Sequence, residues 1–195
     1  MNSNPPGAGK SSFDLIDSKE LFSVMGIKKG DILVDLGCGI GNYSLAASEY
    51  VGSDGKVYAV DLWEQGIETL KQTIFAKGIK TITPIITDMG SDLPLGEDSA
   101  DLCLMATVFH DLLRAGVHER ALAETRRVLK KNGQFVVVEF KKREGPPGPP
   151  MHIRISSREL AKTLGMHGFR QTTTRELGQY HYVSLFTCKN DMRDR

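Results

Sequence analysis

Short apolar runs alternate along this chain of 195 residues with stretches in which apolar residues recur every three or four positions. Runs of four to eight apolar residues are typical of buried strands, and the longer spacing is typical of helices that bury one side. Together the runs and a final strand pair predict a seven-stranded sheet. The predicted strands lie at residues 32–36, 57–60, 82–87, 102–108, 134–140, 169–174 and 182–188.

Between these strands, apolar residues recur with the spacing of a helix. This spacing predicts helices at residues 42–49, 63–77, 117–131 and 156–167. Strands that alternate with helices are typical of the α/β class, so we expect a doubly wound Rossmann-like sheet, mostly parallel, with helices on both faces. A further short helix is predicted to begin after Asp17, which forms a capping box with Glu20, and to end at Gly26.

The length suits one domain, which we predict to cover residues 13–189. Residues 1–12 are rich in Asn, Pro, Gly and Ser and are predicted to be mobile, and residues 190–195 form a charged tail. Residues 7–11 look like part of a P-loop. A P-loop needs a glycine where this chain has Asn4 and a strand in front, so triphosphate binding is not predicted.

The most informative stretch joins the first strand to the first long helix. Gly37, Gly39 and Gly41 alternate there, and without Cβ atoms they let a ligand approach the backbone closely. A strand, a glycine turn and a helix form the phosphate or nucleoside corner of doubly wound sheets. The dinucleotide fingerprint needs its third glycine where this chain has Asn42. Asp35 is a charge inside the strand, which indicates a nearby ligand.

Asp61 ends the second predicted strand, twenty residues after Gly41. An acidic residue at this place can accept hydrogen bonds from ribose hydroxyls. The sequence therefore predicts a nucleoside ligand between the glycine turn and Asp61.

The stretch 31–43 together with Asp61 and Asp88 resembles class I S-adenosylmethionine-dependent methyltransferases, and most closely the small-molecule enzymes of the quinone-biosynthesis and arsenite methyltransferase group. The resemblance covers roughly residues 17–188. It implies S-adenosylmethionine as cofactor, an antiparallel last strand, and a small-molecule methyl acceptor. It also implies a cofactor site made of Asp35, Gly37, Gly39, Gly41, Asp61, Leu62, Asp88 and Met89.

In the resembling family, the carboxylate at the place of Asp88 contacts the adenine amino group. An ionised aspartate only accepts hydrogen bonds, which suits that amino donor, and Met89 would complete the slot. The alternative is that Asp88 caps the next turn.

Methyl transfer from a sulfonium is an in-line displacement, so the protein mainly aligns the acceptor and excludes water. A nucleophile that carries a proton also needs a base. His110 and Asp111 follow the fourth strand, on the substrate side in the resembling family. His110 is a candidate base that Asp111 would orient. Alternatively, Asp111 caps a following helix and His110 packs on it.

A proline-rich stretch at residues 145–150 follows the fifth strand and is either a lid or substrate rim or a plain surface loop. His152 and Arg154 come after it. They are candidates to clamp the substrate, and His152 joins His110 and Asp111 as a candidate catalytic residue.

Charge and cysteine content exclude several classes of protein. With 25 Lys and Arg against 24 Asp and Glu, the chain has no strongly basic surface for nucleic acid. No apolar run could span a membrane, and residues 1–10 do not form a signal peptide. Three cysteines without metal-like spacing suit a reducing cytoplasm and predict no metal site. A homodimer is left open.

Two other functions compete with methyl transfer. A nicotinamide oxidoreductase fits Asp61 but not the glycine spacing, and a non-catalytic module that binds S-adenosylmethionine fits the lack of one decisive catalytic residue.

Several classes of methyl acceptor can be argued against. Enzymes that methylate amino groups of DNA, rRNA or glutamine carry Asn/Asp-Pro-Pro-Tyr after the fourth strand, where this chain has Ala-Thr-Val-Phe at residues 106–109. Catechol enzymes would require a magnesium carboxylate after Phe140. Arsenite enzymes need exposed cysteines, and here Cys38, Cys103 and Cys188 are predicted to be buried.

Overall fold

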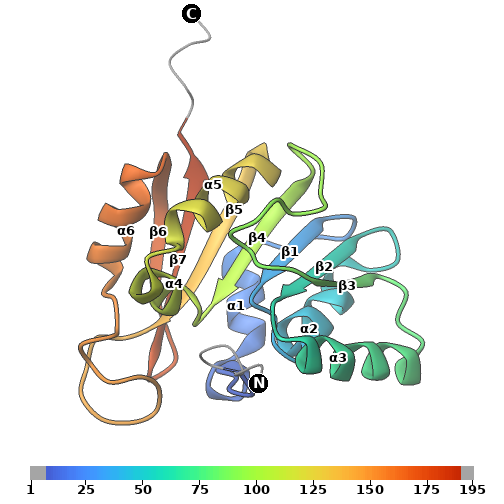
Figure 1. The fold of residues 1–195 in the computed structure, drawn as a ribbon, viewed down its shortest axis with the longest axis horizontal. Coiled ribbons are helices and arrows are strands. Elements are labelled where there is room, and N and C mark those ends of the chain that lie inside the picture. Colours follow the sequence, from blue (N-terminus) through green and yellow to red (C-terminus); the bar gives the residue numbers. More distant parts are fainter. Residues whose placement is uncertain (1–7, 190–195) are drawn as a thin grey trace, which may run out of the picture.

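A computed structural model describes residues 8–189, which form one sheet of seven strands in the order β3-β2-β1-β4-β5-β7-β6 (Figure 1). β7 runs antiparallel to both β5 and β6, and all other neighbours are parallel. The predicted seven-stranded sheet and its antiparallel last strand are therefore confirmed. The strands are β1 (Ile32–Leu36), β2 (Lys56–Asp61), β3 (Ile82–Ile86), β4 (Ala100–Ala106), β5 (Leu129–Phe140), β6 (Phe169–Leu177) and β7 (His181–Cys188).

Helices cover both faces of the sheet, as expected (Figure 1). One apolar cluster joins the sheet to α1 (Ser18–Met25), α2 (Asn42–Val51) and α3 (Glu64–Lys77). The other joins it to α4 (Phe109–Ala115), α5 (His118–Val128) and α6 (Ser157–Met166). Successive side chains of a strand point to opposite faces of the sheet, so Leu33 belongs to the first cluster and Val34 to the second. No helix within residues 8–189 is both long and apolar enough to cross a membrane.

The boundary between α5 and β5 differs from the prediction. The expected helix to residue 131 is wrong, because α5 ends at Val128 and Leu129 already pairs with Ala100 of β4. Leu129 is buried, and Lys130 Nζ lies 2.7 Å from Asp101 Oδ1 on the neighbouring strand. These cross-strand contacts outweigh the local helical spacing.

The end of β4 also differs from the prediction. The strand stops at Ala106 rather than at Val108, and α4 begins at Phe109. Thr107 breaks the strand with a φ of +56°, and its N–H donates to Val138 O at 2.7 Å. His110 and Asp111 consequently lie in the first turn of a helix that the sequence pattern did not predict.

The segment before α1 is partly ordered against the sheet. Residues 8–12 were expected to belong to a mobile segment, but Ser12 is buried and its Oγ lies 2.8 Å from Tyr43 Oη and 3.0 Å from Thr107 Oγ1. A short 3-10 helix, η1 (Phe13–Leu15), follows. Asp17 caps α1 as predicted, by accepting the N–H groups of Lys19 and Glu20. The return hydrogen bond from Glu20 that would complete the predicted capping box is not among those of the described residues. Residues 1–7 and 190–195 lie outside the described part of the chain.

Candidate active site

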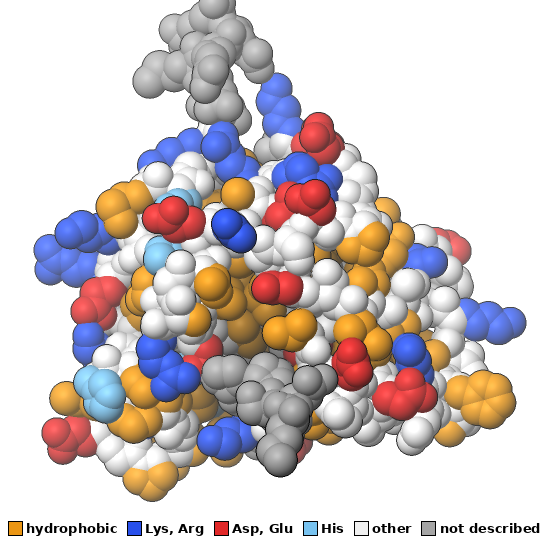
Figure 2. Space-filling model, viewed as in Figure 1, with side chains coloured by type: hydrophobic (Ala, Val, Ile, Leu, Met, Phe, Trp, Pro, Cys, Tyr) orange, Lys and Arg blue, Asp and Glu red, His pale blue; other side chains and the backbone are white. Residues whose placement is uncertain are grey.

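The turns that follow β1, β2, β3 and β4 enclose a cavity of about 280 Å³. The carboxyl ends of neighbouring parallel strands meet at one edge of a sheet, which is where ligands bind in such folds. Figure 2 shows a hollow with hydrophobic side chains near the centre of the molecular face. The lining consists of residues 8–12, Gly37, Cys38, Gly39, Ile40, Tyr43, Asp61, Leu62, Trp63, Asp88, Met89, residues 106–108, Asp111, Leu112, Ala115 and Val117.

Most of the predicted cofactor residues meet at this cavity. Asp35 and Gly41 do not line it. Gly41 is the N-cap residue of α2 and has a φ of +82°, and a Cβ there would clash with the Leu70 side chain of α3. Gly41 therefore allows two helices to pack closely and does not face a ligand. The predicted cofactor residues that do line the cavity are Gly37, Gly39, Asp61, Leu62, Asp88 and Met89.

The other two glycines of the turn serve different purposes. A Cβ on Gly37 would lie 2.7 Å from Val108 Cγ2, so this glycine lets the turn pack against the chain after β4. Gly39 has a φ of +57°, and a Cβ there would have no neighbour within 4 Å. Gly39 thus presents bare backbone to the open cavity, as a ligand-binding glycine turn requires.

Asp61 holds the glycine turn as well as facing the cavity. Its Oδ2 accepts the Gly39 N–H at 2.7 Å, and its Oδ1 accepts the Trp63 N–H at 2.8 Å. Each carboxylate oxygen has a second lone pair, so both can also accept hydrogen bonds from ligand hydroxyls. Asp88 can likewise both cap a turn and contact a ligand. Its Oδ1 accepts the Gly90 N–H at 2.8 Å, and the residue lines the cavity.

Asp35 lies behind the glycine turn, almost completely buried. The Ser44 hydroxyl donates to its Oδ2 at 2.6 Å. Burial raises the pKa of Asp35 to about 7, the Ser44 hydrogen bond opposes this rise, and the negative charge of Asp61 adds to it. The buried site therefore disfavours the ionised form of this carboxyl group.

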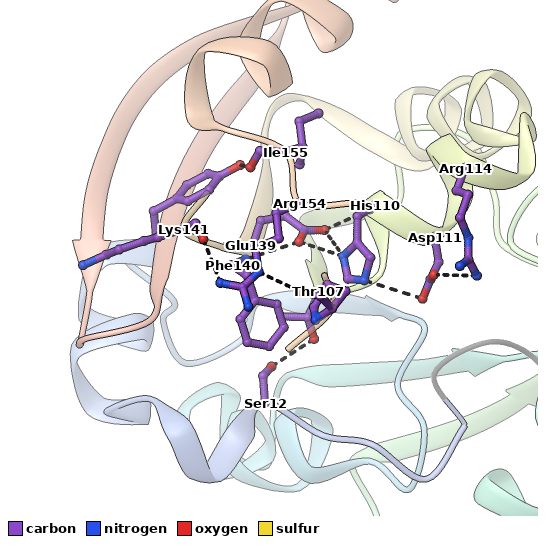
Figure 3. Close-up of polar contacts among 12 residues, drawn as sticks. Ser12, Thr107, His110, Asp111, Arg114, Glu139, Phe140, Lys141, Arg154 and Ile155 are labelled. Carbon is purple, nitrogen blue, oxygen red and sulfur yellow. Dashed lines mark hydrogen bonds and ion pairs between the residues drawn. The ribbon is translucent and has the colours of Figure 1, made fainter. Parts of the chain in front are cut away.

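His110 is buried next to the cavity and does not line it. Its Nδ1 lies 2.8 Å from Oε2 of Glu139, a completely buried carboxylate of β5, and Glu139 Oε1 accepts the backbone N–H of His110 at 3.0 Å (Figure 3). Asp111 was expected to orient His110, but Glu139 holds the ring. Asp111 Oδ2 lies 3.6 Å from His110 Nε2, and Asp111 itself faces the cavity.

The electrostatic setting favours a proton on His110. Burial lowers the pKa of His110, but the hydrogen bonds and charge of Glu139, followed by the charge of Asp111, outweigh it and leave the pKa above its ordinary value. Glu139 was not among the residues predicted from the sequence, where its only mark is that it is a lone acid inside the apolar run of residues 135–140.

The segment after the proline-rich loop does not reach the cavity. His152 is exposed and lies outside the lining. Arg154 is buried and is not placed to clamp a substrate, because its guanidinium is occupied by backbone oxygens of Lys141 and of the loop. It donates hydrogen bonds to the carbonyl oxygens of Lys141, Gly145, Pro147 and Pro149. Figure 3 shows the contact with Lys141.

Two further residues that line the cavity, Thr107 and Cys38, have an unusual backbone conformation and a shifted pKa, respectively. Thr107 is β-branched and has a positive φ, a strained conformation that concentrates at functional sites. Cys38 is buried, and burial raises the pKa of its thiol well above the ordinary value, so the thiol stays protonated and unreactive.

The sequence matches known proteins over the same elements. A family described as methyltransferase domain matches residues 34–137. A 2-phytyl-1,4-naphtoquinone methyltransferase of Trichormus variabilis is 35% identical over 115 residues, which cover 59% of this chain and 49% of the relative. The ubiquinone/menaquinone biosynthesis C-methyltransferase UbiE of Francisella tularensis subsp. holarctica is 27% identical over 172 residues, which cover 88% of this chain and 65% of the relative. The chain thus spans about half to two thirds of the length of these relatives.

Solved structures share the whole fold. A SAM-dependent methyltransferase from Aquifex aeolicus superimposes with a TM-score of 0.83 at 27% identity, covering 95% of this chain and 94% of the other. A putative type 11 methyltransferase from Sulfolobus solfataricus has a TM-score of 0.73 at 23% identity, covering 91% and 95%, and shows the same fold. The family match runs from β1 into β5 and includes the glycine turn and Asp61. The chain therefore belongs to the methyltransferase domain family, and its cofactor is S-adenosylmethionine.

Proposed function

We propose that this protein transfers a methyl group from S-adenosylmethionine to a reduced quinone-type ring. One observation carries the proposal. The cavity joins the cofactor side, with Gly39 and Asp61, to an apolar wall formed by the end of β4 and by α4. Among the described lining residues from 106 to 117, Asp111 is the only charged one. The names of the two relatives, both quinone-biosynthesis methyltransferases, support the class of acceptor.

The residues of the cofactor side fit S-adenosylmethionine, which supplies an activated methyl group when bound. Asp61 would accept hydrogen bonds from the ribose hydroxyls, and Asp88 would accept one from the adenine amino group. Gly39 leaves room for the amino-acid chain, since no atom occupies the place of its missing side chain. Met89, buried beside the cavity, would pack against the adenine.

The opposite wall suits an apolar ring with a hydroxyl group. Val108, Leu112 and Ala115 would exclude water from the ring, and water exclusion strengthens the polar contacts that remain. Asp111 would accept the proton of the ring hydroxyl, because loss of that proton makes the ring carbons more nucleophilic. The carbon that receives the methyl group would then lose its own hydrogen as a proton, which returns the hydroxyl and restores the aromatic ring. Arg114 Nη2, at 3.3 Å from Asp111 Oδ1, and His110 on the other side hold the carboxylate in place.

A turnover assay tests this function. The full chain should be incubated with S-adenosylmethionine and a panel of demethylated naphthoquinols and benzoquinols kept under a reductant, and mass spectrometry should follow S-adenosylhomocysteine and the methylated ring. We expect both products with at least one quinol and none with the already methylated ring. If calorimetry shows cofactor binding but every quinol leaves S-adenosylhomocysteine at the background level, the protein is a binding module and the proposal is wrong.

Replacing Asp111 with asparagine separates acceptor chemistry from cofactor binding. We expect turnover to fall by about tenfold or more, because asparagine has nearly the same shape but cannot take up a proton. The affinity for S-adenosylmethionine should stay within about twofold, since the roles proposed for Asp61 and Asp88 are untouched. His110→Gln should reduce turnover less, because His110 acts through Asp111.

The exposed Asp54 provides the matched control, and Asp54→Asn should leave turnover unchanged. Wild-type turnover in Asp111→Asn would leave alignment of the acceptor as the only catalytic contribution of this wall.

A further inference from the structure

We propose that His118, Glu119 and His167 form a binding site for a divalent transition-metal ion such as zinc, separate from the methyl-transfer cavity. Each of these side chains offers one ligand atom, and the three atoms lie within 4.8 Å of one another. His118 and Glu119 open α5, and His167 follows the last residue of α6. None of the three lines the cavity. The site is thus built by the meeting of two helix ends.

The ligand set is one that zinc uses in proteins. Two imidazoles and one carboxylate bind zinc together with a water molecule at the fourth position. Ligand atoms around one tetrahedral zinc ion lie roughly 3.5 Å apart, as follows from bond lengths of about 2.0–2.2 Å. The three atoms must therefore move inward by about 1 Å at most. Glu119 is exposed and its long side chain can make this adjustment.

The ring of His118 is fixed by packing against two other rings, and one of its nitrogens is available to a ligand. Its ring packs edge-on against Phe109 with 6.2 Å between ring centroids, and against His167 with 5.6 Å. Its Nδ1 is buried and has no hydrogen-bond partner among the described residues. A buried polar nitrogen without a partner costs free energy, so a ring in this state is available to a ligand.

His167 is positioned by the backbone around it. Its N–H donates to Leu164 O at 3.0 Å at the end of α6, and Gly168, with a φ of +84°, then turns the chain into β6. Glu119 adds a negative charge to the two neutral imidazoles, and this charge favours a divalent ion at the site.

A bound ion would connect α6 to the wall of the cavity. Val117 directly precedes His118 and, like Ala115, lines the cavity. An ion coordinated by His118 and His167 would fix the connection between α4 and α5 relative to α6. We therefore expect metal binding to raise the melting temperature, because a ligand that binds only the native state stabilises it.

Zinc titration of the full chain, with any affinity tag removed, tests the site. Calorimetry should show one ion per chain, and the melting temperature should rise with zinc concentration. His118→Gln and His167→Gln should each weaken zinc binding by about tenfold or more. His152→Gln, which changes an exposed histidine elsewhere, should bind zinc like the wild type. All variants should still bind S-adenosylmethionine, which verifies that they fold.

Cobalt substitution distinguishes this site from binding to cysteine. We expect a cobalt spectrum without a thiolate charge-transfer band, and an unchanged spectrum in Cys188→Ser. The proposal is overturned if the wild type binds no zinc, if the His118→Gln/His167→Gln double variant binds zinc as tightly as the wild type, or if a thiolate band appears and is lost in Cys188→Ser.

Discussion

Gly39→Val is expected to weaken binding of S-adenosylmethionine by about a hundredfold or more while the protein stays folded. No atom lies within 4 Å of a Cβ built on Gly39, so the new side chain would project into the cavity that the cofactor must enter. The backbone φ of +57° adds strain for a β-branched residue. Calorimetric titration with S-adenosylmethionine measures the loss, and thermal unfolding measures the strain.

Gly78→Val is the matched control for this experiment. Gly78 ends α3 with a φ of +65°, has no atom within 4 Å of its missing Cβ, and lies outside the cavity lining. Both variants should lose a similar amount of stability, about 1–2 kcal/mol from the left-handed backbone. Only Gly39→Val should lose the cofactor. Equal cofactor affinities in the two variants would mean that a different surface binds S-adenosylmethionine.

Asp35→Asn is expected to increase the free energy of unfolding at pH 8 by about 1–3 kcal/mol. Burial raises the pKa of Asp35 from 3.8 to about 7, so the native protein at pH 8 holds an ionised carboxylate at an energetic cost. A shift of about 3 units corresponds to about 4 kcal/mol as an upper bound, which relaxation of the site reduces. Asparagine can still accept the Ser44 hydrogen bond without carrying a charge.

The sign of the pH dependence follows from the raised pKa. Between about pH 4 and pH 7 the native state holds the Asp35 proton more tightly than the unfolded state. The stability that this proton contributes is complete below pH 4 and is lost as the pH rises through about 7. The stability advantage of Asp35→Asn over the wild type should therefore be small at pH 4 and larger at pH 8.

Urea unfolding of both proteins at the two pH values measures this difference. Ser44→Ala serves as the comparison, because it removes the hydrogen bond that lowers the pKa of Asp35 and should destabilise the protein more at pH 8 than at pH 4. An Asp35→Asn advantage that does not change with pH would show that Asp35 is not protonated in the native state near neutral pH.

Local patterns in the sequence determined most of the elements and one half of the site. The burial of β1 on both faces follows from its apolar run, and the glycine turn and Asp61 lie at the ends of predicted strands. The carboxyl ends of parallel strands meet at one edge of a doubly wound sheet, so the sequence already predicts that Gly39 and Asp61 lie near one ligand. The residues on the cofactor side of the cavity could be predicted because they lie in short continuous segments of the sequence.

Contacts between distant segments decided the rest. Leu129 begins β5 although it continues the helical spacing of α5, because Ala100 offers a strand partner and the core offers burial. Ser12 is held by Tyr43 and Thr107, which no local composition could indicate.

The acceptor side and the proposed metal site depend on tertiary structure in the same way. His110 meets Glu139 across 29 residues, and His118 meets His167 only because α5 and α6 cover the same face of the sheet. The sequence alone determined where most strands and helices and the cofactor turn lie, since their periodicity and glycine chemistry are local. Only the tertiary structure decided which side chains face each other, because burial and charge pairing are set by packing across the sheet.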